Sequence, residues 1–248
     1  MASTISLSDR RQAPPLIQCL SLFKSYVKGR DVLRDVSFEV NKRDFIFLTG
    51  PGGAGKTTFL KLLLGIEPPD RGHILFEGQS LQRMSPKDIP PFRRRTGVVF
   101  QDLKLLAHRT VYENVALPLD IAGMSGALVK NKVLNVLRLL GLDHKTGSKC
   151  DRLSTTEQQL TAIARAVVND PVLLLMDEPA GKIDEETLCR VIELIGSIQV
   201  RGTTVIVASR EGGLREHIHD ARSWTIRDGR VLEQEPLPQP KRRAVPKQ

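Results

Sequence analysis

Aromatic residues and long apolar runs are both scarce in this chain of 248 residues. Phe, Trp and Tyr make up 4% of the sequence, which leaves little material for the aromatic platforms on which single-stranded nucleic acids stack. No apolar run approaches the roughly 20 residues that a membrane-spanning helix needs. The N-terminal stretch MASTISLSDRRQAPP is polar and lacks the apolar core of a signal peptide. We therefore expect a cytoplasmic chain that reaches a membrane only through a partner.

Cysteine is scarce as well, with three residues in the whole chain. Cys19, Cys150 and Cys189 are scattered, odd in number and without the spacing of a metal site. A disulfide framework needs an even set of closely spaced cysteines in an oxidising compartment. We therefore interpret all three as reduced and structural.

Acidic residues are outnumbered by basic ones. The 37 Lys and Arg residues face 28 Asp and Glu residues, so the formal net charge is +9. Part of the excess lies in the C-terminal stretch PLPQPKRRAVPKQ and part in the cluster Arg93, Arg94 and Arg95. Such an excess favours nucleic acid or an anionic membrane surface as a partner. Because stacking aromatics are few, we interpret the tail and the cluster as solvated, and we expect no direct nucleic-acid binding.

Apolar segments and helical patterns alternate along most of the chain. Strand patterns fall at residues 19–23, 36–40, 44–49, 73–78, 96–101, 172–177, 203–209 and 223–234. Helical patterns fall at residues 56–65, 111–118, 127–141, 156–168, 184–199 and, weakly, 212–217. The segments 172–177 and 203–209 are continuously apolar, which is typical of parallel strands buried on both faces. The Asp228-Gly229 pair predicts a hairpin turn within the last strand pattern.

These patterns predict an α/β fold with a mainly parallel sheet. An antiparallel β portion is expected near the N-terminus, and a helical insertion at about residues 102–168 interrupts the α/β pattern. Residues 1–14 and 236–248 are rich in proline and charge, so we expect a flexible N-terminal extension and a flexible basic tail. The folded domain is then expected to cover residues 15–235.

A glycine-rich stretch follows the strand pattern at residues 44–49 and precedes a helical pattern. It fits G-x-x-x-x-G-K-[ST] and comprises Gly50, Pro51, Gly52, Gly53, Ala54, Gly55, Lys56 and Thr57, followed by Thr58. Glycines let backbone N–H groups turn inward around phosphate, the lysine reaches the β- and γ-phosphate oxygens, and the threonine hydroxyl ligates Mg²⁺. The stretch therefore predicts a P-loop that binds ATP and Mg²⁺.

Two acids end the strand pattern at residues 172–177. Asp177 is expected to lie beside the P-loop and to hold the Mg²⁺ shell, and Glu178 is expected to act as a general base that polarises water against the γ-phosphate. Gln101 ends another strand pattern and offers an amide that senses Mg²⁺ and water. Each signal is weak alone, because acids and amides are ordinary at strand ends. Combined with the P-loop they predict a P-loop NTPase core.

Residues 153–166 read LSTTEQQLTAIARA and predict a capped helix start. Ser154 and Glu157 have the spacing of a capping box, in which each side chain accepts a hydrogen bond from the other residue's backbone N–H. The capping box explains the helix. It leaves open what the positive end of that helix faces, since a helix N-terminus is also an anion site.

Taken in order, these elements resemble ABC-type ATPases over roughly residues 17–232. In that family two subunits pair head to tail, and the L-S-G-G-x-Q signature of one subunit caps the γ-phosphate held by the P-loop of the other. LSTTEQ stands at the place of this signature. The resemblance therefore assigns Ser154, Thr155, Thr156 and Glu157 to a site completed across a homodimer, or across a heterodimer with another ABC ATPase. It implies the ABC ATPase fold and ATP hydrolase activity.

The same resemblance assigns roles to two further residues. Tyr26 matches the aromatic residue that stacks on adenine in this family, whereas without the resemblance it reads as an ordinary tyrosine on a strand surface. Asp184 matches the aspartate of the D-loop. Both assignments rest on the family pattern and not on spacing.

The similarity is closer still to the cell-division members of the family. It runs through FRRRTGVVFQDLKLLAHRTVYENVALPLDIAGMSG and ARAVVNDPVLLLMDEP. Those members work on the cytoplasmic side of the bacterial inner membrane, beneath an FtsX-like integral membrane protein, and help to control peptidoglycan hydrolysis. The same partner is implied here, docked near residues 101–125. ATPases of lipoprotein-release and macrolide-export systems share much of the pattern and stay open as alternatives, as does a soluble ATPase acting on nucleic acid or ribosomes.

The chain departs from the family pattern at several positions. Thr155 and Thr156 replace the two signature glycines, and β-branched residues neither tolerate positive φ nor allow a close backbone approach to phosphate. Arg210 replaces the switch histidine; it can still donate to a γ-phosphate, but its length changes the geometry around Glu178. Lys182 replaces the D-loop asparagine, and Leu160 replaces a common arginine. We expect firm ATP binding with weak hydrolysis, and a hydrolysis-impaired switch or scaffold is the alternative.

Overall fold

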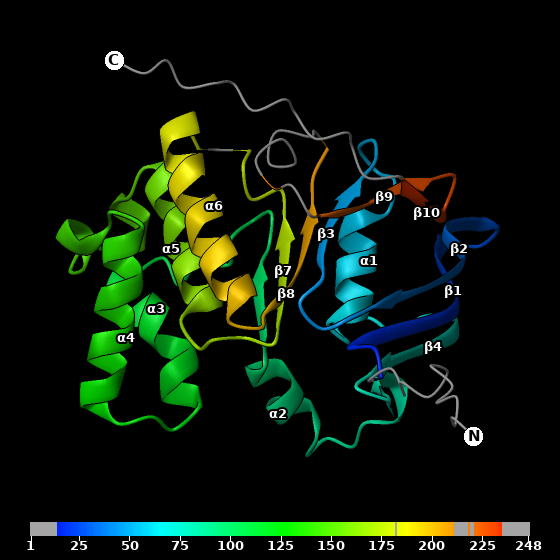
Figure 1. Cartoon of the computed structure of the whole chain (residues 1–248), viewed down its shortest axis with the longest axis horizontal. Helices are drawn as coiled ribbons and strands as arrows, with labels where there is room; N and C mark the ends of the chain where they lie inside the picture. Colours follow the sequence, from blue (N-terminus) through cyan, green and yellow to red (C-terminus); the bar gives the residue numbers. More distant parts are fainter. Residues whose placement is uncertain (1–13, 182, 211–217, 219–220, 235–248) are drawn as a thin grey trace, which may run out of the picture.

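The computed structural model describes residues 14–181, 183–210, 218 and 221–234 (Figure 1). Within these ranges two sheets and a group of helices lie side by side, with the sheets on the right of Figure 1 and most of the helices on the left. The helical pattern at residues 212–217 lies outside the described residues. The expected flexible ends also lie outside them, apart from residue 14, so the domain bounds 15–235 stay a prediction.

The first sheet is antiparallel and comes from the N-terminal part of the chain. Its strand order is β2 (Arg30–Val40), β1 (Ile17–Val27), β4 (Arg71–Phe76) and β5 (Gln79–Ser80). Each of its strand pairs is antiparallel. The antiparallel portion that the sequence predicts near the N-terminus is therefore confirmed.

The second sheet is mainly parallel. Its strand order is β10 (Arg230–Gln234), β9 (Arg222–Arg227), β3 (Phe45–Thr49), β8 (Thr204–Ala208), β7 (Leu173–Asp177) and β6 (Thr96–Val99). The pairs from β9 to β6 are parallel, and β9 and β10 form an antiparallel hairpin that turns at Asp228 and Gly229, as predicted. All five residues of β7 and of β8 are buried, as their continuous apolar runs predict.

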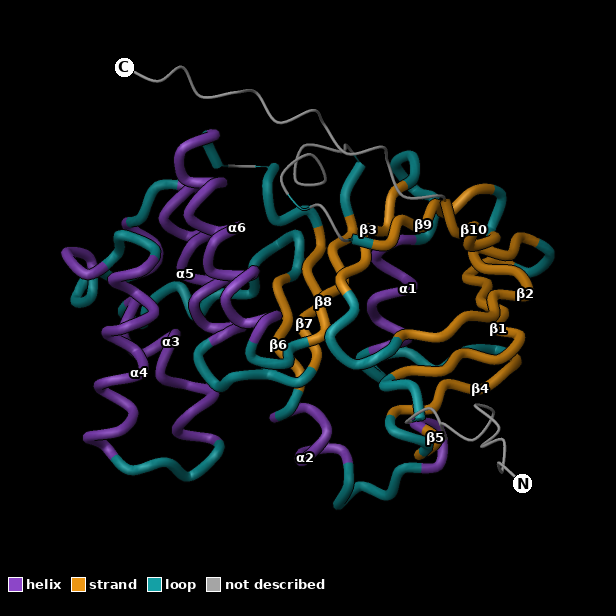
Figure 2. The backbone as a smooth tube through the Cα atoms, viewed as in Figure 1, coloured by secondary structure: helices purple, strands orange, loops and turns teal. Residues whose placement is uncertain are grey.

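Helices cover both faces of the parallel sheet. The longer ones are α1 (Lys56–Leu63), α3 (Val111–Ile121), α4 (Gly126–Leu139), α5 (Thr155–Val167) and α6 (Glu185–Val200). Figure 2 shows α3, α4, α5 and α6 together at one side of the molecule, and α5 packs directly against β6. In the part of the chain that the structure describes, 3₁₀ turns also lie at Leu81–Arg83, Asp143–Lys145 and Cys150–Arg152.

The short helix α2 (Ile89–Arg94) is not predicted by the sequence patterns. Its first residues include Pro90 and Pro91, which usually signal a break. Proline is nevertheless tolerated in the first turn of a helix, because the N–H groups there have no partner within the helix. The buried ring of Phe92 then anchors α2, packing edge-on against Phe76 with ring centroids 5.0 Å apart.

Two hydrophobic cores lie on opposite faces of the parallel sheet. Along β3, Phe45 and Phe47 point into one core, which α3, α4, α5 and α6 complete. Ile46 and Leu48 point into the other, which α1 and the antiparallel sheet complete. This alternation follows from the two-residue period of a strand. The parallel pairing of β3, β8, β7 and β6 places their carboxyl ends at one edge, where the P-loop begins.

The three cysteines are all free, as expected, but they differ in environment. Cys19 and Cys150 are buried in the two cores, whereas Cys189 is exposed on α6. Burial therefore supports a structural role for Cys19 and Cys150, whereas the exposure of Cys189 contradicts one there. No helix in the described ranges is both long and apolar enough to cross a membrane.

Candidate nucleotide-binding site

The P-loop follows β3 and enters α1 through residues that only glycine suits. Gly50 has φ 150°, and a Cβ there would lie 2.8 Å from the carbonyl oxygen of Ile226. Gly55, the residue that caps α1, has φ 105°, and a Cβ there would lie 2.9 Å from Cγ1 of Val32. Both positions combine a left-handed backbone with crowding, which excludes a side chain. The turn therefore needs glycine at the first and last glycine positions of the motif.

A cavity of about 400 Å³ lies at this edge of the sheet. Its lining brings together residues that are far apart in the sequence: Tyr26, Val32, Gly52, Gly53, Ala54, Gly55, Lys56, Thr57, Thr58, Gln101, Asp177, Glu178 and Arg210. Because β3, β6, β7 and β8 run parallel, the segments that follow them meet at one edge. The cavity therefore contains most of the residues that the sequence predicts for the phosphate and base sites.

The ammonium group of Lys56 is held inside the loop. Its Nζ donates to the carbonyl oxygens of Gly50 at 2.7 Å and Pro51 at 3.3 Å, and the residue is 7% exposed. Burial lowers the pKa of Lys56, and the nearby carboxylates of Glu178 and Asp177 oppose that shift. An ammonium held by two backbone carbonyls and a loose ion pair with Glu178 is well placed to exchange these partners for phosphate oxygens.

Thr57 and Asp177 present two oxygen ligands side by side. The Thr57 hydroxyl donates to Oδ2 of Asp177 at 2.6 Å. Burial raises the pKa of Asp177, although the hydrogen bond from Thr57 acts in the opposite direction, so a cation beside this carboxylate would offset its desolvation. Gln101 lies on the same cavity wall. One carboxylate, one hydroxyl and one amide fit Mg²⁺, which takes few protein ligands and keeps several waters.

Glu178 is held in place by backbone and side-chain contacts. It has a positive φ of 51°, and its N–H donates to the carbonyl oxygen of Ala208 at 2.8 Å. Its carboxylate accepts from the backbone N–H of Arg210 at 3.2 Å and from the guanidinium Nε of Arg210 at 3.2 Å. Its Oε1 lies 3.9 Å from Nζ of Lys56. The arginine at the switch position therefore pairs directly with the expected general base.

Tyr26 lies at the rim of the cavity and is 55% exposed. Its hydroxyl donates to Oε2 of Glu67 at 2.5 Å and lies 3.3 Å from the hydroxyl oxygen of Thr58. Glu67, which lies outside the cavity lining but holds Tyr26, and Val32, which lines the cavity, were not predicted from the sequence. Neither belongs to a recognisable motif. Only the end of α1 at Gly65, just before Glu67, hinted that this stretch returns toward the P-loop.

The predicted signature residues Ser154, Thr155, Thr156 and Glu157 do not line this cavity. They form the N-terminus of α5, where the predicted capping box is present: Glu157 N–H donates to Ser154 Oγ at 3.2 Å, and Ser154 N–H donates to Glu157 Oε2 at 2.8 Å. Ser154 and Thr155 are exposed. A role for this terminus at the phosphates therefore requires a second subunit.

Asp184 also lies outside the cavity, as the N-cap of α6. Its side chain accepts from the backbone N–H of Thr187 at 2.9 Å and from the Thr187 hydroxyl at 3.0 Å. The hydrogen bond from the Thr187 backbone lowers the pKa of Asp184. Within one chain this residue is a helix cap, and its D-loop role stays a prediction. Lys182 lies outside the described residues.

A parallel sheet with a P-loop and an adjacent Asp-Glu pair, completed by an antiparallel sheet and a helical layer, defines an ATP-binding cassette. The family described as ABC transporter matches residues 33–181, and the chain belongs to this family. It is thus an ABC-type ATPase, as the resemblance implied.

Within this family the chain is similar to cell division ATP-binding proteins and to a solved dimeric cassette. The chain is 38% identical over 220 residues to the cell division ATP-binding protein FtsE of Bacillus subtilis (strain 168), a match that covers 89% of this chain and 96% of the relative. It is 41% identical over 208 residues to FtsE of Escherichia coli (strain K12), covering 84% and 93%. Among solved structures, the dimeric ATP-binding cassette MJ0796 in a post-hydrolysis state with ADP and Pi superimposes with a TM-score of 0.81 at 27% identity, covering 88% of this chain and 97% of that one.

Proposed function

We propose that the chain is an FtsE-like ATP-binding subunit that acts in cell division and in the control of peptidoglycan hydrolases. In this proposal it works at the cytoplasmic side of the bacterial inner membrane and couples ATP binding, with slow hydrolysis, to an FtsX-like integral membrane protein. The observation that carries the proposal is the similarity to FtsE over 84% to 89% of the chain. The dimeric state of MJ0796 supports a sandwich of two such subunits, either a homodimer or a heterodimer.

In this proposal the residues of the cavity bind phosphate, bind Mg²⁺ or activate water. Lys56 and the backbone N–H groups of the P-loop would hold the β- and γ-phosphates, while Thr57, Asp177 and Gln101 would hold Mg²⁺. When bound, Mg²⁺ supplies positive charge that neutralises the phosphate oxygens. Glu178 would orient and deprotonate the attacking water. Asp177 is already hydrogen-bonded to Thr57, so the two Mg²⁺ ligands are pre-arranged.

A second cavity, of about 440 Å³, offers a place for the membrane partner. Its lining contains Leu117, Pro118 and Ile121 of α3 together with the basic residues Arg93, Arg94, Lys104 and Arg165. Ile121 is 62% exposed, so its apolar side chain is accessible to a partner beside the cavity. A lining that combines apolar and basic side chains suits an amphipathic segment that carries acidic residues. Part of this groove, lined by Lys104, Leu117, Pro118 and Ile121, belongs to the region near residues 101–125 expected for docking.

Arg165 links this groove to the nucleotide cavity. Its guanidinium donates to the carbonyl oxygens of Leu103 at 2.6 Å and Lys104 at 2.8 Å, two residues with positive φ that follow Gln101. A partner that displaces Arg165 would release this strained turn, and Gln101 on the cavity wall would move with it. Docking of a partner in the groove would therefore change the Mg²⁺ site through the few residues that link Arg165 to Gln101.

The partner proposal is tested by co-purification of the full chain with a co-expressed FtsX-like protein in detergent. Ile121→Glu places a charge on the apolar wall and is expected to abolish the complex. Leu128→Glu is the matched control, because Leu128 is 46% exposed on α4 and does not line the groove, so the complex should survive. Retention of both variants contradicts docking in the groove, and failure of the unmodified chain to co-purify contradicts the FtsX-like partner.

The ion pair between Arg210 and Glu178 favours a second candidate, a hydrolysis-impaired ATP switch. The arginine occupies carboxylate lone pairs through which a general base accepts a proton, with Nε 3.2 Å from Oε1. Oxyanion-type donors are worth about 10²-fold each in rate, so the loss of the switch histidine and of signature glycines predicts slow turnover with intact binding. ATP would then set an assembly state.

Steady-state phosphate release separates the working ATPase from the switch. We expect a slow unmodified chain and a rate at least about tenfold higher for Thr155→Gly, Thr156→Gly, Arg210→His combined. Arg210→His alone reports the ion pair, and the double glycine variant reports the signature. An ordinary rate in the unmodified chain would contradict the switch and leave the ATPase subunit in place.

A further inference from the structure

A hydrogen-bonded network at the rim of the nucleotide cavity is not part of the phosphate machinery. The hydroxyl of Tyr26 donates to Oε2 of Glu67 at 2.5 Å. The other carboxylate oxygen of Glu67 accepts from Nζ of Lys61 at 3.0 Å. Because the single phenolic proton goes to Glu67, the hydroxyl of Thr58, 3.3 Å away, is the donor toward the phenolic oxygen. The phenolic oxygen therefore has two protein partners.

Both partners of the phenol are fixed to the helix that carries the P-loop. Thr58 lies in the first turn of α1. Glu67 follows the end of α1, where Gly65 has φ 61° and the N–H groups of Gly65 and Ile66 donate back to the carbonyl oxygens of Leu62 and Lys61, both at 3.0 Å. This 5→2 and 6→1 pair is a Schellman motif, which ends a helix with a defined exit direction. The position of Glu67 relative to the P-loop is thus set by α1 itself.

The ring of Tyr26 is also supported from one side. Nζ of Lys24 lies 5.6 Å from the ring centroid, within the range of a cation–π contact. Lys24 is itself 9% exposed, and its ammonium donates to the carbonyl oxygen of Pro68 at 2.9 Å. The tyrosine nevertheless stays 55% exposed beside the cavity. The ring is therefore held by its hydroxyl and by Lys24 while a large part of its surface stays open.

We propose that Glu67 is a positioning residue for the nucleobase: it fixes the ring of Tyr26 at a set place relative to the P-loop before the nucleotide arrives. The inference rests on the proposed function, in which Tyr26 stacks on the base. Stacking on a mobile ring would also have to order that ring. The entropy lost by immobilising one such side chain weakens binding by about two- to tenfold. Glu67 removes that cost, and the hydrogen bond from Lys61 orients its carboxylate.

Isothermal titration of the full chain with ADP and, separately, with inorganic pyrophosphate tests this inference. Glu67→Ala is expected to weaken ADP binding by about two- to tenfold and to leave pyrophosphate binding unchanged, because only ADP carries a base. Tyr26→Phe keeps the ring but loses the hydroxyl, so it should show the same loss. The double variant should be no worse than either single one, since both remove one interaction. Glu67→Gln, which keeps an acceptor oxygen, should restore binding to within about twofold.

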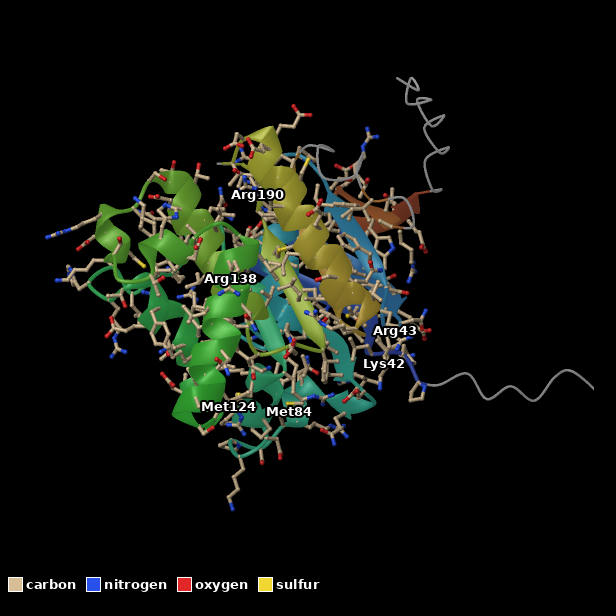
Figure 3. All side chains as sticks on the ribbon, turned by 60° about the vertical axis from the view of Figure 1, so that its left-hand side comes forward. Lys42, Arg43, Met84, Met124, Arg138 and Arg190 are labelled. Atoms are coloured by element: carbon tan, nitrogen blue, oxygen red, sulfur yellow. The ribbon has the colours of Figure 1, made fainter. Side chains whose placement is uncertain are left out.

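Glu186→Ala is the matched control. Glu186 on α6 pairs with Arg190 across one turn at 2.6 Å, and Figure 3 shows Arg190 on that helix. This variant loses a carboxylate–cation pair without touching the network, so ADP affinity should not change.

The outcomes separate the inference from the function on which it rests. Tyr26→Ala should weaken ADP binding by on the order of tenfold, the size of one base–aromatic stacking contact. If Tyr26→Ala has no effect, the stacking role fails, and the inference fails with it. If Tyr26→Ala weakens binding while Glu67→Ala does not, stacking stands and the positioning role of Glu67 is overturned. A parallel loss of pyrophosphate affinity in Glu67→Ala would also overturn it, because that result indicates distortion of the P-loop.

Discussion

Helix α1, which follows the glycine-rich P-loop, and helix α5, which begins at the threonine-containing signature segment, differ in how their N-termini are capped. Helix α1 is capped by Gly55, has no side-chain cap hydrogen bond and has no acid in its first turn. Helix α5 is capped by Ser154 in a complete capping box, with Glu157 as an acid in its first turn. A helix N-terminus leaves several N–H groups without partners inside the helix. In α1 the chain provides no side chain for these groups, whereas in α5 it provides both a hydroxyl and a carboxylate.

This difference shows where the chain is prepared for a ligand anion. At α1 the positive end of the helix and Lys56 face the cavity together, so phosphate meets little competition. At α5 the carboxylate of Glu157 already occupies the terminus and pairs with Lys145 at 3.0 Å. A γ-phosphate from a second subunit would meet a terminus whose charge is already compensated and whose first positions carry β-branched threonines. We therefore expect α1 to dominate binding and α5 to contribute mainly to closure of the dimer.

Removing the cation at α1 should have the largest effect. Lys56→Ala is expected to abolish measurable nucleotide binding, because truncating one partner of a buried charge-assisted contact costs on the order of 10²-fold or more. Titration with a fluorescent ATP analogue measures this loss, with unchanged thermal unfolding as the check on folding. Undiminished affinity would contradict the P-loop assignment.

Glu178→Gln tests whether α5 takes part at all. Without the general base, bound ATP should persist and hold two subunits together, with α5 of each closing over the other's nucleotide. Size-exclusion chromatography with saturating ATP and Mg²⁺ should then show a dimer for the variant and mainly monomer without nucleotide. A variant that stays monomeric with saturating ATP would show that α5 has no partner to cap, and the sandwich would be wrong for this chain.

The contribution of the capping box to stability can be measured by comparison with a helix start that lacks one. Ser154→Ala should lower the free energy of unfolding by about 1 kcal/mol, the usual cost of losing an N-cap side chain. Ser125→Ala is the control, because Ser125 caps α4 without a side-chain hydrogen bond and should change stability little. Urea unfolding of both variants gives the comparison. Equal effects at the two serines would mean that the capping box adds nothing specific.

The smallest effect concerns the charge of Glu157. The backbone N–H of Ser154 is the main cause that lowers the pKa of Glu157, with help from Lys145. A carboxyl whose pKa is lower in the folded state adds stability above its unfolded pKa of about 4.3, and that stability is lost as the pH falls through the folded value. Glu157→Gln should therefore be less stable than the unmodified chain near neutral pH, with a difference that shrinks as the pH falls below about 4. Thermal unfolding at several pH values measures it, and a pH-independent difference would assign the effect to packing.

Much of the fold could be predicted from local patterns. The run of apolar residues before Gly50, the glycines and Lys56 define a strand, a turn and a helix within one short stretch, so no distant contact is needed to predict them. The capping box at Ser154 is equally local and was predicted correctly. Helix α2 was not predicted because Pro90 and Pro91 usually indicate the end of a helix. Proline disrupts a helix only in its interior, however, and is tolerated in the first turn.

The sequence by itself determined the phosphate loop, the acids at the end of β7 and the capped start of α5, because each depends on neighbours in the chain. Only the tertiary structure decided that Arg210 pairs with Glu178 and that Glu67 holds the hydroxyl of Tyr26. The first contact exists because β7 and β8 run parallel and end at the same edge. The second exists because the Schellman turn after α1 directs the chain back toward β1. Side chains separated by 32 and 41 residues meet only when strand order and helix ends bring them together, and no local pattern encodes that distance.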